Sequence, residues 1–255
     1  MNEQELLISR IHDKILAAER GYMITHTGFL SLSERSLAAS VCRESGAKYA
    51  FWGGYADAER TALFILPDYM EPTEPFVPEA EDEPLCLFTC RTSKGSRALS
   101  HRDYLGSLLA LGVERSVIGD ILVYENGADI IVMQSIADYL LANYEKAGST
   151  PLKTEILPIS ALTPPELKTQ TVRESVASLR LDNMLTAIFP ISRTEAATAI
   201  AKGLVFVNDT EAAKPDAHLK EGDKLVLRGH GKVYFREIAG NTRKGRIAVV
   251  FEKFV

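Results

Sequence analysis

The chain has 255 residues, of which 46% are hydrophobic and 25% charged, a composition typical of a globular protein with room for two or three small domains. No stretch approaches the roughly 18 apolar residues that cross a bilayer, and the charged opening MNEQELLISRIHDK lacks a signal peptide's apolar core, so we expect a cytoplasmic protein with no membrane partner. The formal charge of -5 is uneven: residues 171–255 carry 14 Lys and Arg against 10 Asp and Glu, a net +4, whereas residues 1–170 carry 15 against 24, a net -9.

Residues 1–75 are predicted to form a small α/β domain. Apolar residues recur at helical spacing in the first segment, at Leu7, Ile11, Ile15 and Leu16. A second helix is predicted over 33–45, followed by two strands in KYAFWGGYADAERTALFILP. Residues 71–84, EPTEPFVPEAEDEP, hold four prolines and six acidic side chains and are predicted to be a linker or exposed loop.

Residues 84–160 predict a ferredoxin-like middle domain. LCLFTC, GDILVY, ADIIVM and LKTEIL are predicted strands, and HRDYLGSLLALG and SIADYLLANYEKAG are predicted helices, which gives the order βαββαβ. RNA-recognition domains share this order but stack bases on aromatic side chains of the central strands, and ADIIVM has none. A scaffold or docking domain therefore stays open beside an RNA-binding one.

The cysteines and histidines do not predict a metal site. Cys42, Cys86 and Cys90 are an odd set with no histidine pair nearby, which indicates buried thiols. The five histidines show no metal-ligand spacing. We expect neither a metal nor a cofactor.

A new folding unit is predicted to begin near residue 171. A capping signature at Thr163 and Glu166 suggests a one-turn helix in LTPPEL, and TVRES repeats this helix-start signature with Thr171 and Glu174. SLRLDNMLTAIFP predicts a helix with Leu181, Met184, Leu185 and Ile188 on one face. Arg180, Asp182 and Thr186 are expected to lie away from that apolar stripe.

A second short helix follows in ISRTEAATAIAKG. Ser192 is the predicted N-cap and Glu195 completes a capping box, Ala197 and Ile200 are expected to face inward, and Gly203 is the predicted C-terminal cap. Four or five small antiparallel strands follow, with a turn at Asn208 and Asp209 and a final hairpin connected by AGNTRKGR. The second helix is rich in alanine and threonine, which disfavours readout of DNA bases, so no DNA partner is expected.

These motifs resemble the S4 RNA-binding domain. The resemblance covers roughly residues 178–228: RLD on the first helix, SR opening the second, then KGLVFVN, KP and EGDKLVLRG. With FWGGYADAERTALFILPDY, HRDYLGSLLALGVERSVIGDI and the C-terminal GHGKVYFREIAGNTRKGRIAVVFEKF, almost the whole chain resembles the YlmH-type S4-domain proteins of bacteria. The expected fold is thus a multi-domain α+β protein with an α/β segment at 1–75, a ferredoxin-like domain at 84–160 and an S4 domain at 171–255.

The resemblance implies a function. Members of that family associate with the large ribosomal subunit in rescue of stalled translation, so the implied partners are rRNA of the 50S particle and peptidyl-tRNA, with a nascent-chain tailing factor as a further one. A link to cell division is also implied. Cations and hydroxyl groups that could meet phosphates and sugars give the candidate RNA-contacting residues, which are Arg180, Ser192, Arg193, Thr194, Lys202, Lys214, Arg228, Lys232, Arg243, Lys244 and Arg246. Asn208 as a turn former and Asp182 as a partner within the domain are at least as well supported as direct contacts.

Catalysis has no positive sequence support. HRD, at His101, Arg102 and Asp103, is similar to a kinase catalytic loop, but Leu108 stands where the asparagine should be and no glycine-rich loop precedes it. These three residues are expected to form a helix cap or a contact surface of unknown role. RLD also occurs in pseudouridine synthases, many of which carry an S4 domain. In those enzymes the S4 domain precedes a large catalytic domain, whereas only about 25 residues follow the S4 core here. An RNA-modifying enzyme targeted by S4, or a division scaffold with RNA affinity, remains the alternative to a non-enzymatic RNA-binding protein.

Overall fold

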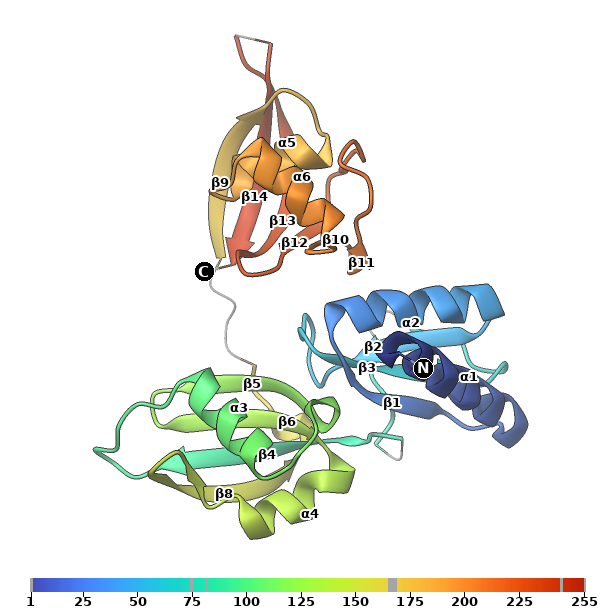
Figure 1. Ribbon diagram of the computed structural model, residues 1–255, viewed down its shortest axis with the longest axis vertical. Helices are drawn as coiled ribbons and strands as arrows, with labels where there is room; N and C mark the ends of the chain where they lie inside the picture. Colours follow the sequence, from blue (N-terminus) through green and yellow to red (C-terminus); the bar gives the residue numbers. More distant parts are fainter. Residues whose placement is uncertain (1, 74–75, 81, 165–168, 244, 255) are drawn as a thin grey trace. The chain divides into compact units, whose positions relative to one another are not determined.

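The protein consists of two compact units, Met1–Pro165 and Glu166–Val255 (Figure 1). A computed structural model describes residues 2–73, 76–80, 82–164, 169–243 and 245–254. Helices and sheets occur in both units, which confirms the predicted multi-domain α+β class. The predicted domains 1–75 and 84–160 both lie in the first unit. Within the described part of the chain, every helix is too short or too polar to span a membrane.

The N-terminal part packs two helices on a three-stranded antiparallel sheet of order β1-β3-β2. Its elements are α1 (Glu3–Gly21), β1 (Thr25–Leu30), α2 (Leu32–Ser45), β2 (Lys48–Trp52) and β3 (Thr61–Leu66). Both helices begin at capping boxes, and Ile11 and Ile15 join Leu63 and Ile65 in one buried cluster. The helix predicted from Leu7, Ile11, Ile15 and Leu16 is confirmed, although Leu16 is 45% exposed, and strand β1 was not predicted.

The middle part has the predicted βαββαβ order. Its elements are β4 (Leu85–Thr92), α3 (His101–Ala110), β5 (Ile118–Tyr124), β6 (Gly127–Met133), α4 (Gln134–Asn143) and β8 (Thr150–Pro158), with short elements η1 (Arg115–Val117), β7 (Lys146–Ala147) and η2 (Ile159–Ala161). The antiparallel sheet order β5-β6-β4-β8-β7 places the first and third strands of the motif at its centre, as in ferredoxin-like domains. Phe88, Tyr104 and Tyr144 lie in the core between sheet and helices.

The face of the middle sheet that carries no helix packs against the N-terminal sheet. Leu85, Ile131 and Met133 form one buried cluster with Phe29 and Phe64. RNA-recognition domains present base-stacking aromatics on this face. Here apolar side chains of the central strands are covered by another part of the same unit, which explains why the two predicted domains form one compact body.

A buried polar network holds the same joint. The Asp120 carboxylate, which is 9% exposed, accepts hydrogen bonds from the Tyr55 hydroxyl at 2.8 Å and from the backbone amides of Glu59 at 2.8 Å and Arg60 at 3.0 Å. The Arg60 guanidinium donates to the carbonyls of Ile118, Phe29 and Arg115 at 3.1 Å each. The sequence segments ADAER and VERSVIGD therefore contact each other through these hydrogen bonds.

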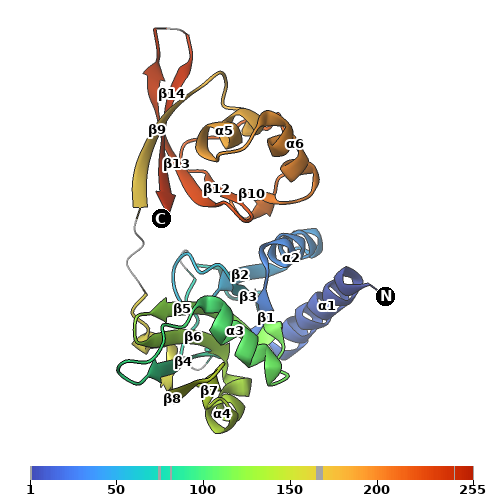
Figure 2. The same ribbon diagram turned by 60° about the vertical axis from the view of Figure 1, so that its left-hand side comes forward.

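The second unit is a helix pair on one face of a six-stranded sheet of order β11-β10-β12-β13-β14-β9 (Figure 2). Its elements are β9 (Thr169–Val176), α5 (Leu181–Ile188), α6 (Arg193–Ala201), β10 (Val205–Val207), β11 (Thr210–Glu211), β12 (Lys224–Leu227), β13 (Gly231–Asn241) and β14 (Ile247–Phe254). Leu181, Leu185 and Ile200 of the helices share a core with Val233 and Phe235 of the sheet.

The start of this unit differs from the prediction. Thr171 and Glu174 do not begin a helix, because both lie in β9, which pairs with β14 along its whole length. The helix expected in LTPPEL falls partly on residues 165–168, outside the described residues. Asn208 has the predicted turn role: φ is 50°, and its side-chain carbonyl accepts a hydrogen bond from the Lys224 amide at 2.9 Å.

Candidate nucleic-acid interface

The second helix of the pair is fixed at both ends. The Ser192 amide donates to the Glu195 carboxylate at 2.7 Å and the Glu195 amide to the Ser192 hydroxyl at 3.2 Å, as the capping box predicts. Gly203, with φ of 65°, donates to the Ile200 carbonyl at 3.0 Å and Leu204 to the Ala199 carbonyl at 3.0 Å, the Schellman arrangement that favours glycine. One detail was wrong: Ala196, not Ala197, is buried against the core.

Asp182 joins the two helices by holding an arginine from each. Its carboxylate accepts two hydrogen bonds from the Arg180 guanidinium, at 3.1 and 3.0 Å, and one from Arg193 at 3.2 Å. The Asp182 side chain is 8% exposed, whereas those of Arg180 and Arg193 are 37% and 66% exposed. Asp182 is therefore the partner within the domain that the sequence suggested, and both guanidinium groups keep donors facing solvent.

The hydrogen bonds of this cluster favour the ionised form of the Asp182 carboxylate. The hydrogen bonds from Arg180 contribute most to lowering the pKa of Asp182, and Arg193 and the Asn183 amide act in the same direction. Two arginines around one carboxylate leave the cluster net positive. Because the carboxylate fixes their position, little side-chain freedom remains to be lost when the guanidinium groups meet phosphate.

Replacing the carboxylate tests this arrangement. Asp182→Asn is expected to lower the free energy of unfolding of the second unit by about 1–2 kcal/mol at pH 7, because the neutral amide is a weaker acceptor for charged donors. The folded pKa of Asp182 lies below its unfolded value, so this stability is fully present above the unfolded pKa of about 4 and is lost as pH falls through the folded pKa. Urea titrations followed by NMR signals of α5 and α6 at pH 7 and at low pH measure the difference. A wild-type advantage that did not shrink on acidification would contradict this role.

The segment around Lys214 is brought to the same end of the helix pair. The Asp182 amide donates to the Pro215 carbonyl at 3.0 Å and the Leu181 amide to the Ala217 carbonyl at 2.8 Å. Lys214 is exposed and adjoins this contact, and Thr194 is exposed in the first turn of α6. Arg180, Arg193 and the segment that carries Lys214 therefore lie at the same end of the helix pair, whereas the Ser192 hydroxyl accepts the capping hydrogen bond.

The remaining predicted contacts lie elsewhere on the unit. Lys202 follows the last residue of α6, and Arg228 lies beside the same helix end because its amide donates to the Leu204 carbonyl at 2.9 Å. Lys232 is on β13, where Val233 and Phe235 face the helices, so Lys232 points to the opposite face of the sheet. Arg243 and Arg246 are exposed in the β13–β14 turn, and Lys244 lies outside the described residues. The ten predicted residues that the structure describes thus occupy several surfaces rather than one.

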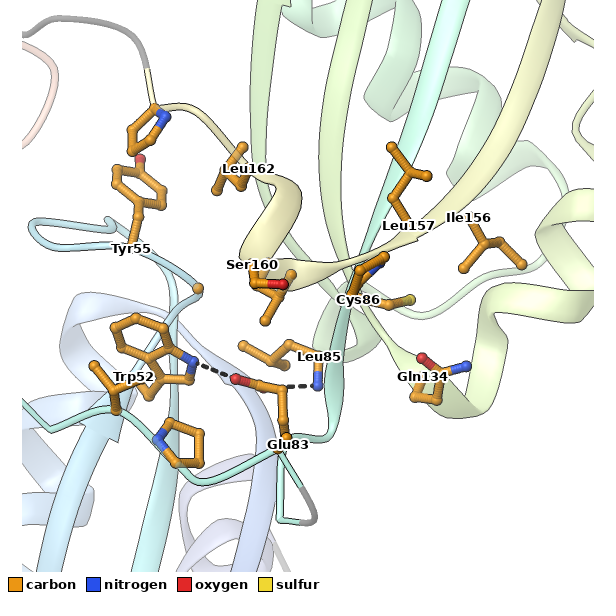
Figure 3. Close-up of a pocket in the computed structure, with 17 residues that line it drawn as sticks. Trp52, Tyr55, Glu83, Leu85, Cys86, Gln134, Ile156, Leu157, Ser160 and Leu162 are labelled. Atoms are coloured by element: carbon orange, nitrogen blue, oxygen red, sulfur yellow. Dashed lines mark hydrogen bonds between the residues drawn. The ribbon is translucent and has the colours of Figure 1, made fainter.

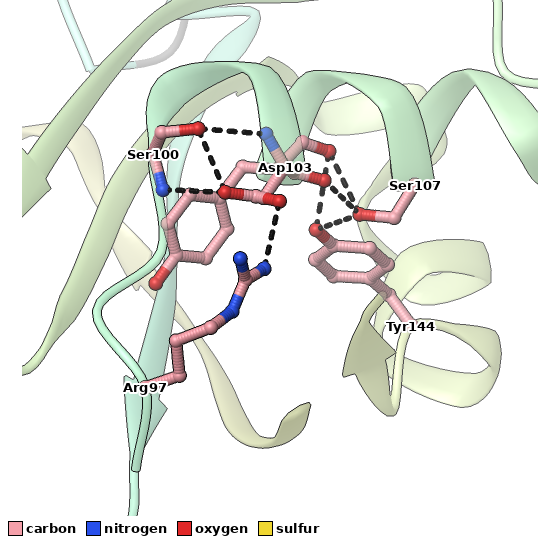
Figure 4. Close-up of polar contacts among 6 residues, drawn as sticks. Arg97, Ser100, Asp103, Ser107 and Tyr144 are labelled. Carbon is pink, nitrogen blue, oxygen red and sulfur yellow. Dashed lines mark hydrogen bonds and ion pairs between the residues drawn. The ribbon is translucent and has the colours of Figure 1, made fainter. Parts of the chain in front are cut away.

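The HRD segment starts helix α3 (Figure 4). Ser100 is the N-cap, and the Asp103 carboxylate accepts hydrogen bonds from the Ser100 amide at 2.8 Å, the Ser100 hydroxyl at 2.7 Å and Arg97 at 2.9 Å. These bonds, those from Ser100 first, lower the pKa of Asp103 to about 2. Asp103 thus completes the capping box of α3, while His101 and Arg102 are exposed. Ser107 and Tyr144 join the same helix to α4 through a 2.8 Å hydrogen bond between their hydroxyls.

A cavity of about 660 Å³ lies at the joint of the first unit (Figure 3). It is lined mainly by apolar side chains, among them Trp52, Leu85 and Ile159. The Trp52 indole and the Leu85 amide each donate to the Glu83 carboxylate at 2.9 Å, and burial raises the pKa of Glu83. Glu83 therefore attaches the segment just before β4 to the joint between the two sheets. Among the described residues, no group of His, Cys, Asp and Glu could hold a metal ion.

Comparison with known proteins gives the family. Residues 78–161 match the family model described as "Putative RNA-binding domain in YlmH", and residues 179–225 match the S4 domain. The chain is 32% identical over 232 residues to "Ribosome-associated protein quality control protein P2" of Bacillus subtilis (strain 168), covering 91% of this chain and 88% of that relative. The chain belongs to the YlmH family. The S4 match of this YlmH-family protein contains Arg180, Asp182 and Arg193, and the two domain matches support a role in RNA binding.

One solved structure is also similar to this YlmH-family chain. It is "Cell division protein ylmH from Streptococcus pneumoniae", with 25% identity and a TM-score of 0.49 over 63% of this chain and 94% of that one.

Proposed function

We propose that this YlmH-family protein binds the large ribosomal subunit and peptidyl-tRNA through its α5–α6 helix pair and acts in rescue of stalled translation. The observation that carries the proposal is the pair of partly exposed arginines, Arg180 and Arg193, held by the buried Asp182 inside the S4 domain. The name of the Bacillus subtilis relative, a ribosome-associated quality control protein, supports the ribosome as the target.

The chemistry of the helix pair favours RNA over DNA. The exposed side chains of α6 beyond its first turn are Ala197, Thr198 and Ala201, which are too short to reach base edges in a major groove. The cations lie at the ends of the helix, where they can meet a folded RNA backbone. We propose that the protein acts by binding rather than by catalysis. The net charge of -9 on residues 1–170 repels phosphates and favours protein partners for that part of the chain.

Sedimentation with purified 50S particles tests the proposal. The protein should co-sediment with 50S particles, and more of it should do so when they carry peptidyl-tRNA. If about four phosphates of unpaired RNA are neutralised, the logarithm of the affinity should fall against the logarithm of the salt concentration with a slope of about -3. Absence of co-sedimentation at low salt would refute the proposal, and turnover on rRNA or binding of S-adenosylmethionine would favour an RNA-modifying enzyme instead.

A further inference from the structure

The sheet of the second unit has a face that α5 and α6 do not cover. Val233 and Phe235 on β13 contact the helices, and side chains alternate along a strand, so Lys232, Tyr234 and Arg236 lie on the opposite face. We call it the outer face. Phe254 and Glu252 of β14 lie on it too, since Tyr234 is directly opposite Glu252 in the sheet register.

Aromatic rings and cations alternate on the outer face. The Lys232 ammonium is 4.5 Å from the centre of the Phe254 ring, and the Arg236 guanidinium is 4.7 Å from that of Tyr234. The two rings are 5.7 Å apart and tilted. Tyr234 and Phe254 are only half-buried, so part of each ring is open to solvent on this face. Aromatic side chains between cations on a sheet are the arrangement by which proteins bind single-stranded nucleic acid.

We propose that the outer face is a second RNA-binding surface, on which unpaired bases stack against Tyr234 and Phe254 while Lys232 and Arg236 contact the flanking phosphates. This inference rests on the proposed function, because it assumes an RNA target. The cation–π contacts are weak at a partly exposed site. Charge-assisted hydrogen bonds to phosphate are stronger than these ring contacts. Arg173, exposed on β9 opposite Val250, adds a further cation to the same face.

Glu252 on the outer face is expected to oppose RNA binding, in contrast to the aromatic rings. It forms an ion pair with Arg236 on the outer face, and hydrogen bonds from Thr169 and Arg236 lower its pKa. A phosphate approaching Arg236 therefore meets a carboxylate of like charge and competes with it for the guanidinium. Neutralising Glu252 should strengthen RNA binding, whereas truncating Tyr234 should weaken it.

Binding of the full-length protein to two probes tests this surface. The probes are a fluorescein-labelled 12-nucleotide oligouridylate and an abasic backbone of the same length, measured by fluorescence anisotropy. Tyr234→Ala and Tyr234→Leu should each bind the oligouridylate about tenfold more weakly, with little change on the abasic probe. Tyr234→Phe should bind like the wild type, because a phenyl ring also stacks. Glu252→Gln should bind the oligouridylate severalfold more tightly.

The controls separate this inference from the proposed function. Equal affinity of wild type and Tyr234→Leu for oligouridylate, or an equal loss on both probes, would overturn the stacking surface. Weaker binding by Glu252→Gln would also overturn it. If the Tyr234 effects are as expected but 50S binding does not depend on Arg180 and Arg193, the outer face stands and the proposed function fails. If 50S binding needs both arginines but Tyr234 has no effect, the outer face alone is rejected.

Discussion

Replacing both Arg180 and Arg193 with alanine is expected to weaken binding to 50S particles about a hundredfold. Each guanidinium offers charge-assisted hydrogen bonds to phosphate, for which a loss of about tenfold per contact is typical. The salt slope of the affinity should also become shallower by about 1.4, because two phosphate contacts to unpaired RNA are lost. Equilibrium titration of labelled 50S particles at several salt concentrations measures both quantities.

A matched control is available on the first unit. Arg10→Ala with Arg20→Ala removes two exposed arginines from α1 and changes the net charge equally. This control should retain most of the wild-type affinity and salt slope, because α1 belongs to the acidic unit. Equal losses in the two double variants would show that overall charge, rather than the Asp182 cluster, determines binding.

Asp120→Ala is expected to lower the free energy of unfolding of the first unit by about 3 kcal/mol. The substitution leaves the Tyr55 hydroxyl and the amides of Glu59 and Arg60 without their buried acceptor, and unsatisfied buried donors cost about 1–3 kcal/mol each, partly relieved by relaxation or water. Arg60, whose guanidinium bridges three carbonyls of the joint, also loses the Asp120 carboxylate and keeps that of Glu34 nearby.

Trp52 provides the measurement. It is the chain's single tryptophan and lies at the sheet joint, hydrogen-bonded to Glu83. Urea unfolding followed by its fluorescence should show a lower midpoint for Asp120→Ala than for the wild type. Asp138→Ala, which removes an exposed carboxylate from α4, serves as the control. Coinciding midpoints for Asp120→Ala and the wild type would mean that the apolar cluster alone holds the joint.

Local sequence signals predicted much of the fold. Capping boxes, a terminal glycine and helical spacing located α5 and α6, and alternating apolar runs located the strands of the middle domain. The prediction failed where a distant partner decides the structure. TVRES satisfies a helix-capping pattern, yet it forms β9 because β14, some 75 residues later, offers a complete strand edge. Likewise, the apolar face of the middle sheet did not reveal in sequence that the N-terminal sheet covers it.

The candidate site was predictable in part. Arg180 and Arg193 were selected for their charge, but only the structure shows that Asp182 holds them together. Lys232 was grouped with them, although strand alternation places it on the face opposite its neighbour, the buried Val233. The same alternation in KVYFRE could have indicated Tyr234 and Arg236 as its neighbours on that face.

We propose that the S4 helix pair of this YlmH-family protein holds RNA on the 50S particle. Ultraviolet cross-linking of the full-length protein bound to 50S particles, followed by mass spectrometry of the cross-linked peptides, tests it most directly. We expect rRNA or tRNA cross-links in peptides from residues 179–202, and these cross-links should disappear in the Arg180→Ala, Arg193→Ala variant. Cross-links confined to residues 1–165, with none in the helix pair, would contradict it.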